Sequence, residues 1–193
     1  MDPSHGYEGI ADRFLQARSL TGAATVRAWA EGLPRGGRVL DLGCGSGEPV
    51  TRVLAEAGLD VYGIDASPTL VQVFRDKLPE VPVRCEDVLT SDFFGLTYDA
   101  IVAIGLVFLL DEVAQKQLLR KCVAHLRADS GRDAPLLFSA PREAVEWEDV
   151  LTGRLSRSLG EAGYRDALQG LDLQVDNYGT DEGGNAYFNL RRC

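Results

Sequence analysis

A short apolar run that stops at a glycine-rich turn restricts the fold of this chain more than any other feature. Residues 38–42 read RVLDL, and glycines follow at positions 43, 45 and 47. Such a run predicts a buried strand, and glycines permit tight turns that a ligand can approach closely. Residues 48–57 then have the apolar spacing of a helix, which Gly58 ends. Strand, turn and helix together predict a ligand site at the carboxyl end of the strand.

The same alternation of strand and helix continues along the chain. Further strands are predicted at residues 60–64, 81–85, 98–103 and 134–139. Helices are predicted between them at residues 68–78, with Ser67 as the cap, and 111–126. Such alternation requires crossovers, and hence a mostly parallel sheet with helices on both faces.

The end of the chain departs from this alternation. Residues 171–177 and 185–190 are two predicted strands joined by a turn-rich connector without a helix, so they form an antiparallel hairpin. We therefore predict an α/β fold with a seven-stranded, mostly parallel, doubly wound sheet and a C-terminal antiparallel hairpin. We expect a single domain over residues 1–193, with an N-terminal helical cap at 1–33 and a short lid segment at 141–170.

Composition excludes several classes of protein. The chain carries 20 basic and 29 acidic residues, a net charge of −9, which is unsuited to binding nucleic acid. No run approaches the roughly 18 to 20 apolar residues of a membrane span, and the N-terminus lacks the pattern of a signal peptide. The four cysteines have no CxxC spacing, so we expect reduced thiols and a cytoplasmic protein. With only two histidines, no metal site is expected.

The glycine spacing also excludes two nucleotide-binding motifs. The dinucleotide pattern GxGxxG fails, because its last position is Glu48 or Val50. The phosphate-binding pattern GxxxxGK[ST] is absent, since no lysine follows the turn. Glu48 places an anionic group at the start of the helix, which is unfavourable for pyrophosphate. The turn therefore favours a ligand without phosphates.

Residues 39–47, VLDLGCGSG, resemble the first motif of the class I S-adenosylmethionine-dependent methyltransferases at nearly every position. The resemblance extends over about residues 7–190 and includes the terminal hairpin. It implies that S-adenosylmethionine is the cofactor. It also implies a set of cofactor-binding residues, namely Arg18, Asp41, Gly43, Cys44, Gly45, Gly47, Asp65, Ala66, Glu86, Asp87, Val88 and Ile104.

The implied roles are chemically reasonable. The Asp65 carboxylate accepts from both ribose hydroxyls, and because Ser67 already caps the next helix, Asp65 is expected to be available to the ligand. Asp87 accepts from the exocyclic amine of adenine. Asp41 helps to hold the turn and the cofactor's ammonium group, and Arg18 pairs with the cofactor's carboxylate.

The acceptor side is less defined. One subset of amino methyltransferases has an Asn/Asp-Pro-Pro-Tyr-type motif after the fourth strand, whereas residues 104–107 here read IGLV. This favours a small, partly apolar acceptor over a nucleobase or a glutamine amide. No convincing general base is found: His5 and Tyr7 are weak candidates, and His125 is expected at the surface. The candidate substrate-binding residues are Tyr7, Phe108, Arg142 and Trp147.

The sequence thus predicts an enzyme that transfers a methyl group to a small-molecule N, O or S acceptor by in-line displacement. Two alternatives remain: a protein methyltransferase that recruits a basic tail, and a non-catalytic cofactor-binding protein that acts through a partner. Neither the acceptor nor the oligomeric state follows from the sequence.

Overall fold

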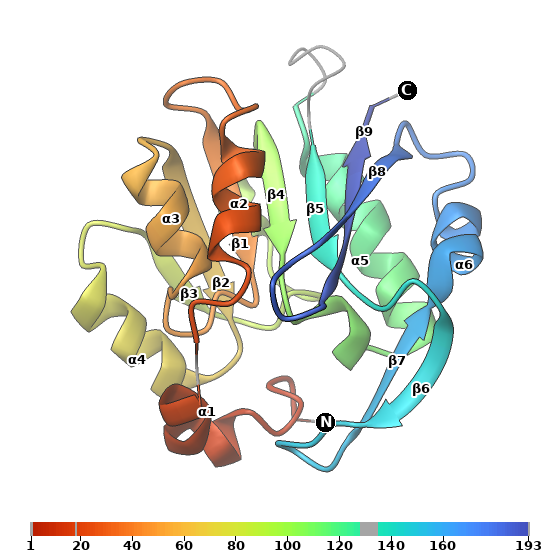
Figure 1. Ribbon diagram of the computed structural model, residues 1–193. Helices are drawn as coiled ribbons and strands as arrows, with labels where there is room; N and C mark the ends of the chain where they lie inside the picture. The colour runs from red at the N-terminus through yellow and green to blue at the C-terminus, as the bar shows by residue number, and fades with distance from the viewer. Residues whose placement is uncertain (1, 18, 128–134, 193) are drawn as a thin grey trace.

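The computed structural model describes residues 2–17, 19–127 and 135–192, which form one central sheet with helices on both faces (Figure 1). The sheet has seven strands in the order β3-β2-β1-β4-β5-β9-β8. Neighbouring strands from β3 to β5 are parallel, whereas β9 is antiparallel to both β5 and β8. This confirms the predicted fold class. The strands of this sheet are β1 (Arg38–Leu42), β2 (Asp60–Asp65), β3 (Val83–Cys85), β4 (Ala100–Ala103), β5 (Leu136–Ser139), β8 (Gln174–Thr180) and β9 (Ala186–Arg191).

Two apolar clusters separate the helices into layers. On one face, Val26 of α2 and Leu54 of α3 pack against Val39 of β1. On the other face, Leu118 of α5 and Tyr164 of α6 pack against the sheet. The helices are α1 (Ala11–Ala17), α2 (Ala23–Ala30), α3 (Val50–Glu56), α4 (Pro68–Lys77), α5 (Glu112–His125) and α6 (Gly160–Ala167), with short 3₁₀ turns η1 (Glu8–Ile10), η2 (Phe93–Gly95) and η3 (Val107–Leu109).

Most helices and strands lie where the sequence predicted them, but a few predicted boundaries were wrong. Strand β4 begins at Ala100, because Tyr98 makes only an isolated bridge with Leu126 and buries its ring. The last hairpin is shifted toward the C-terminus, so residues 178–180, predicted as connector, belong to β8. Apolar runs predict strand centres, whereas hydrogen bonding determines strand ends.

Residues 141–170 contain a second antiparallel hairpin that the sequence did not reveal. Strands β6 (Ala144–Glu148) and β7 (Leu155–Leu159) form a separate two-stranded sheet. Their sequences, AVEWE and LSRSL, are short and mostly polar, so they lack the apolar run that marks a buried strand. In Figure 1 this hairpin lies on the same side of the molecule as α1 and the N-terminus, below the main sheet.

A buried polar network attaches this hairpin to the main body. Gln115 of α5 is fully buried and donates to the carbonyls of Leu110 and Arg157, at 2.9 and 3.0 Å. The hydroxyl of Tyr164 in turn donates to Gln115 Oε1 at 2.9 Å. The network therefore fixes β7 and the end of η3 relative to α5.

Replacing Tyr164 with Phe removes this donor and leaves Gln115 Oε1 buried without it. We expect the free energy of unfolding to fall by about 1–3 kcal/mol, the usual penalty for an unsatisfied buried acceptor. Urea denaturation measures this change. Tyr178→Phe is the matched control, because its hydroxyl bonds an exposed Arg165; equal losses in the two variants would contradict the role given to the network.

No helix in the described part of the chain is long and apolar enough to cross a membrane.

Candidate functional site

The glycine turn after β1 is held by the neighbouring strand. The backbone N–H groups of Gly43 and Cys44 donate to the carbonyl of Ile64 at 2.8 and 3.1 Å. Gly45 has a φ of +54°, and a Cβ there would lie 3.7 Å from Phe14, across open space. Gly47 differs, because a Cβ there would lie 2.6 Å from Leu78. Gly45 therefore keeps the backbone accessible to a ligand, whereas Gly47 permits close packing of α4.

Asp65, at the end of β2, joins this turn to the next helix. Its Oδ2 accepts from the backbone N–H of Gly45 at 2.8 Å, and its Oδ1 accepts from that of Ser67 at 2.8 Å. Burial raises the pKa of the carboxyl group. The expectation that Ser67 leaves Asp65 free for a ligand was wrong, since both oxygens already accept from the backbone. Each oxygen has a second lone pair with which it can accept from a ligand hydroxyl.

The N-terminal segment is attached to the same corner. Glu8 accepts from the hydroxyls of Ser67 and Thr69 and from the Thr69 backbone N–H. Ser67 at the same time accepts from Leu70 N–H, which confirms its predicted role as the cap of α4. Glu8 thus adds a negative charge at the N-terminus of this helix, where the helix dipole favours it.

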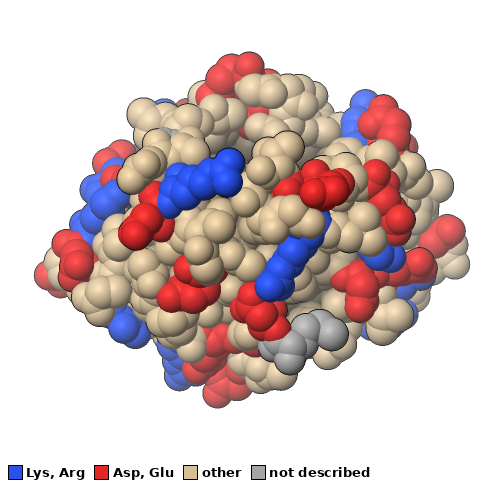
Figure 2. All heavy atoms as spheres, turned by 90° about the horizontal axis from the view of Figure 1, so that it is seen from below, with Lys and Arg blue, Asp and Glu red and all other residues tan. Residues whose placement is uncertain are grey.

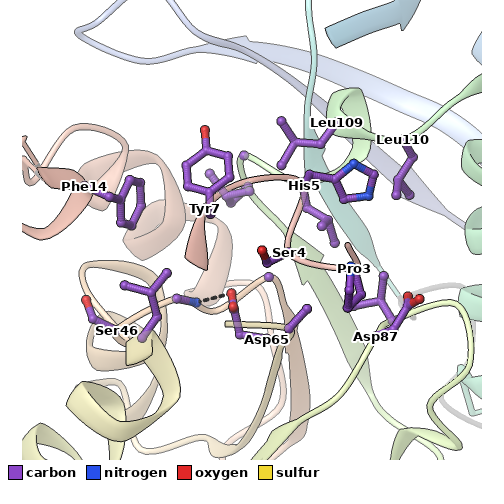
Figure 3. Close-up of a pocket in the computed structure, with 18 of the residues that line it drawn as sticks. Pro3, Ser4, His5, Tyr7, Phe14, Ser46, Asp65, Asp87, Leu109 and Leu110 are labelled. Carbon is purple, nitrogen blue, oxygen red and sulfur yellow. Dashed lines mark hydrogen bonds between the residues drawn. The ribbon is translucent and has the colours of Figure 1, made fainter. Parts of the chain in front are cut away.

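These elements enclose a cavity of about 230 Å³ at the carboxyl end of the parallel strands (Figure 3). Its floor consists of the glycine turn and Asp65. Residues 2–7 form a roof over it, in which Ser4 lies above Asp65 and His5 lies beside Leu109 and Leu110. The side walls are Phe14, Asp87 and Val88, and Ile104, Gly105, Leu106, Phe108, Leu109 and Leu110.

Part of the chain is similar to known methyltransferases. Residues 39–129 match a family model described as a methyltransferase domain. The putative methyltransferase YqeM of Bacillus subtilis is 38% identical over 100 residues, which are 50% of this chain and 40% of that protein. A demethylmenaquinone methyltransferase of Tropheryma whipplei is 33% identical over 116 residues, 59% of this chain and 47% of that protein. This chain thus spans less than half the length of either relative.

A solved structure extends the comparison to the whole fold. CalS10 with bound SAM, an amino pentose methyltransferase from Micromonospora echinaspora, aligns with a TM-score of 0.72 at 19% identity, over 95% of each chain. The chain therefore has the fold of this methyltransferase, and residues 39–129 carry the match to the family model.

The structure gathers most of the predicted cofactor positions around one cavity. Those that line it are Gly43, Gly45, Asp65, Ala66, Asp87, Val88 and Ile104. Four others, Asp41, Cys44, Gly47 and Glu86, lie outside its lining. Arg18 lies outside the described residues. Several lining residues are short or apolar and belong to no motif, so the sequence did not indicate them; these are Pro3, Ser4, Leu70, Leu109 and Leu110.

Asp41 and Cys44 support the turn from behind. Asp41 is 1% exposed, and its Oδ2 accepts from the hydroxyl of Thr51 at 2.6 Å. The Cys44 side chain is buried against Gly63, where a Cβ would lie 2.9 Å from its sulfur. Burial raises the pKa of the Cys44 thiol, so the thiol is protonated at neutral pH.

Glu48 lines the cavity, but its charge is compensated. Helix α3 begins at Val50, after Glu48, and the Glu48 carboxylate pairs with Arg52 at 2.9 Å and with Lys77. These two cations lower the pKa of Glu48. From the sequence, Glu48 was expected to repel an anionic ligand. Because Arg52 and Lys77 pair with its carboxylate, this repulsion is weaker than expected.

Two candidate substrate residues lie in a neighbouring cavity. Arg142 and Trp147 line a space beside the first cavity, and Phe108 lines both. The ring centroids of Phe108 and Trp147 are 5.3 Å apart. Arg142 pairs with Glu161 at 3.0 Å and lies over the ring of Tyr178.

Neither histidine lies where the sequence predicted it. His5, in a terminus expected to be mobile, lines the cavity with a φ of +51°. His125, expected at the surface, is half-buried: its ring packs on Phe93 and its Nδ1 lies 2.9 Å from the Leu96 carbonyl oxygen. The position of His5 in the roof makes it the more accessible of the two to a bound acceptor.

Burial of His5 lowers the pKa of its imidazole, so the ring is neutral at pH 7. We expect a pH titration followed by NMR to give His5 a pKa below the ordinary value of about 6.5. The variant His125→Gln assigns the resonances, because the chain has only two histidines. A His5 pKa at or above the ordinary value would show that the roof does not bury this ring in solution.

Proposed function

We propose that this protein is a methyltransferase that binds S-adenosylmethionine and transfers its methyl group to an N, O or S atom of a small molecule. One observation carries the proposal: Asp65 holds Gly45 of the glycine turn at 2.8 Å on the floor of an enclosed cavity. This arrangement presents a carboxylate and an exposed backbone to the same ligand. It suits a ligand that has vicinal hydroxyls and no phosphate.

The lining supports a distribution of roles along the cofactor. Asp65 would accept from the ribose hydroxyls, while Ala66, Glu86, Asp87 and Val88 would surround the adenine ring. The backbone of Gly43, Cys44 and Gly45 would lie against the ribose and amino-acid portions. Asp41 would act indirectly, by holding the turn from behind, and Ile104 would pack beside the amino-acid portion.

The cofactor supplies an activated sulfonium methyl group when bound, so the protein mainly positions the acceptor and excludes water. The roof serves the second purpose, because residues 2–7 cover the cavity. Leu106, Phe108 and Leu109 provide an apolar wall facing it. His5, whose ring is neutral, would accept a proton from acceptors that must lose one, and Tyr7 would do so only as a phenolate.

A small acceptor is favoured over a protein tail. Two similar proteins are a demethylmenaquinone methyltransferase and an amino pentose methyltransferase. Figure 2 shows the face that carries the roof, with acidic and basic side chains of the described residues interspersed on it rather than gathered in one patch. The β6–β7 hairpin and residues 2–7 together would act as the lid, and residues 1–33 as the N-terminal cap. We place the protein in the cytoplasm, in keeping with the free thiols of Cys44, Cys85 and Cys122.

Isothermal titration calorimetry with S-adenosylmethionine tests the proposal. We expect binding in the micromolar range by the parent protein. Asp65→Asn should weaken it roughly ten- to a hundredfold, because the ribose hydroxyls lose a charged acceptor. Asp60→Asn, at the opposite end of β2 and exposed, is the matched control and should bind normally. No binding by the parent protein would refute the proposed function.

Turnover separates an enzyme from a cofactor-binding protein that acts through a partner. Release of S-adenosylhomocysteine is measured over a library of small metabolites. At least one acceptor should give release above the background with cofactor alone. Cofactor binding without release from any acceptor would support the non-catalytic alternative.

A further inference from the structure

A second cavity, of about 450 Å³, adjoins the first. It is bounded by the end of β5, by Trp147 of β6 and by the start of β9. Two contacts connect the cavities. Phe108 lines both of them, and the hydroxyl of Tyr7, which lines the first, lies 3.5 Å from Asp149 Oδ2, which lines the second. The two cavities therefore share a wall that includes Phe108, Tyr7 and Asp149.

The charged groups of this second cavity are mostly acidic. Asp149 and Glu143 are its carboxylates and Arg142 is its one cation among the described residues. Arg142 is already paired with Glu161 and stacked on Tyr178. An anionic acceptor would thus meet two carboxylates and a cation that is already paired, which is unfavourable in a partly enclosed site.

Asp149 is built to present one oxygen to this space. The residue is 9% exposed. Its Oδ1 accepts from the backbone N–H groups of Leu151 and Thr152, at 3.1 and 2.8 Å, and from the Thr152 hydroxyl at 2.9 Å. Within the described part of the chain, its Oδ2 accepts one hydrogen bond, from the Tyr7 hydroxyl at 3.5 Å. Arg154 pairs with Asp2 at 2.9 Å, and no salt bridge to Asp149 is found among the described residues. A buried carboxylate in this situation favours a cationic or N–H-donating ligand.

An aromatic wall lies next to this oxygen. The rings of Phe108 and Trp147 lie at 48° to each other, with centroids 5.3 Å apart. Aromatic faces bind apolar rings, and they also attract ammonium groups. The second cavity thus combines one apolar wall with one buried carboxylate.

We propose that this second cavity is the acceptor site and that the acceptor is an amine carried on an apolar or ring-shaped scaffold. The inference rests on the proposed methyltransferase function and specifies its substrate class. The scaffold packs on Phe108 and Trp147, and the nitrogen is bound by Asp149 Oδ2 and points into the first cavity.

The transfer is balanced without a further reactant. The amine gives up its excess proton to solvent, and its lone pair then forms a bond to the methyl carbon. The carbon–sulfur bond breaks with its electron pair on sulfur, which leaves S-adenosylhomocysteine. Positive charge passes from sulfur to nitrogen, and Asp149 stabilises it there before the new ammonium group loses its proton to solvent.

Trp147 provides a reporter for this site. The chain has only two tryptophans, so Trp29→Phe leaves Trp147 as the single one. In this background, with S-adenosylhomocysteine present, the probe phenethylamine is titrated against phenethyl alcohol and 3-phenylpropionate. We expect phenethylamine to change the Trp147 fluorescence and to bind roughly tenfold more tightly than the alcohol, and the acid to bind most weakly.

Asp149→Asn tests the carboxylate, since the amide oxygen can still accept from Leu151 and Thr152. It should weaken phenethylamine binding roughly tenfold and leave the alcohol unchanged. Glu148→Gln, an exposed neighbour outside the cavity lining, is the matched control and should change neither. If circular dichroism shows that Asp149→Asn is unfolded, the preference of the parent protein for amine over alcohol decides the question.

Calorimetry with S-adenosylmethionine on the same proteins separates the two proposals. Cofactor binding with equal affinities for amine and alcohol would overturn the amine site and leave the proposed function standing. An amine preference that survives in Asp149→Asn would overturn the role of this carboxylate. Failure to bind the cofactor would refute the methyltransferase function, and the acceptor site with it.

Discussion

The bridge that Asp65 makes between two backbone turns determines the geometry of the site. One carboxylate accepts from Gly45, after β1, and from Ser67, before α4. Because β1 and β2 are parallel neighbours, their carboxyl ends lie at the same edge, and the bridge fixes the two turns there. Glu8 then attaches the N-terminal segment to the same helix start. Floor and roof of the cavity are thus built on one corner of the sheet.

The fold was predictable because its signals are local. Residues 38–42 are an apolar run, Ser67-Pro68 is a helix start, and the last two strands lack an intervening helix; each feature is visible without tertiary information. The positions of three residues that line the first cavity were predictable for a related reason. Asp65, Asp87 and Ile104 follow parallel strands, and the topology alone brings such positions to one edge.

The roof and the second hairpin were harder to predict because they depend on long-range contacts. Strands β6 and β7 are mostly polar and are held by Gln115, which is more than 40 residues away from Arg157 in sequence. His5 and Ser4 belong to a segment without periodicity, ordered by Asp2 and Glu8 through contacts with Arg154 and Thr69. Arg142 was predictable as a basic residue near a ligand site, and it lines the second cavity, but its pairing with Glu161 was not predictable from the sequence.

The contacts that hold the roof over the first cavity are made with the loop beside the second cavity. Asp2 pairs with Arg154, and Tyr7 contacts Asp149, so the roof of the first cavity is attached to the loop that carries Asp149. The first cavity, at about 230 Å³, is smaller than the roughly 300–1,000 Å³ typical of ligand pockets. The roof that bounds this small cavity is thus held by the segment between β6 and β7, through Asp2 and Tyr7, as well as by Glu8 at the start of α4.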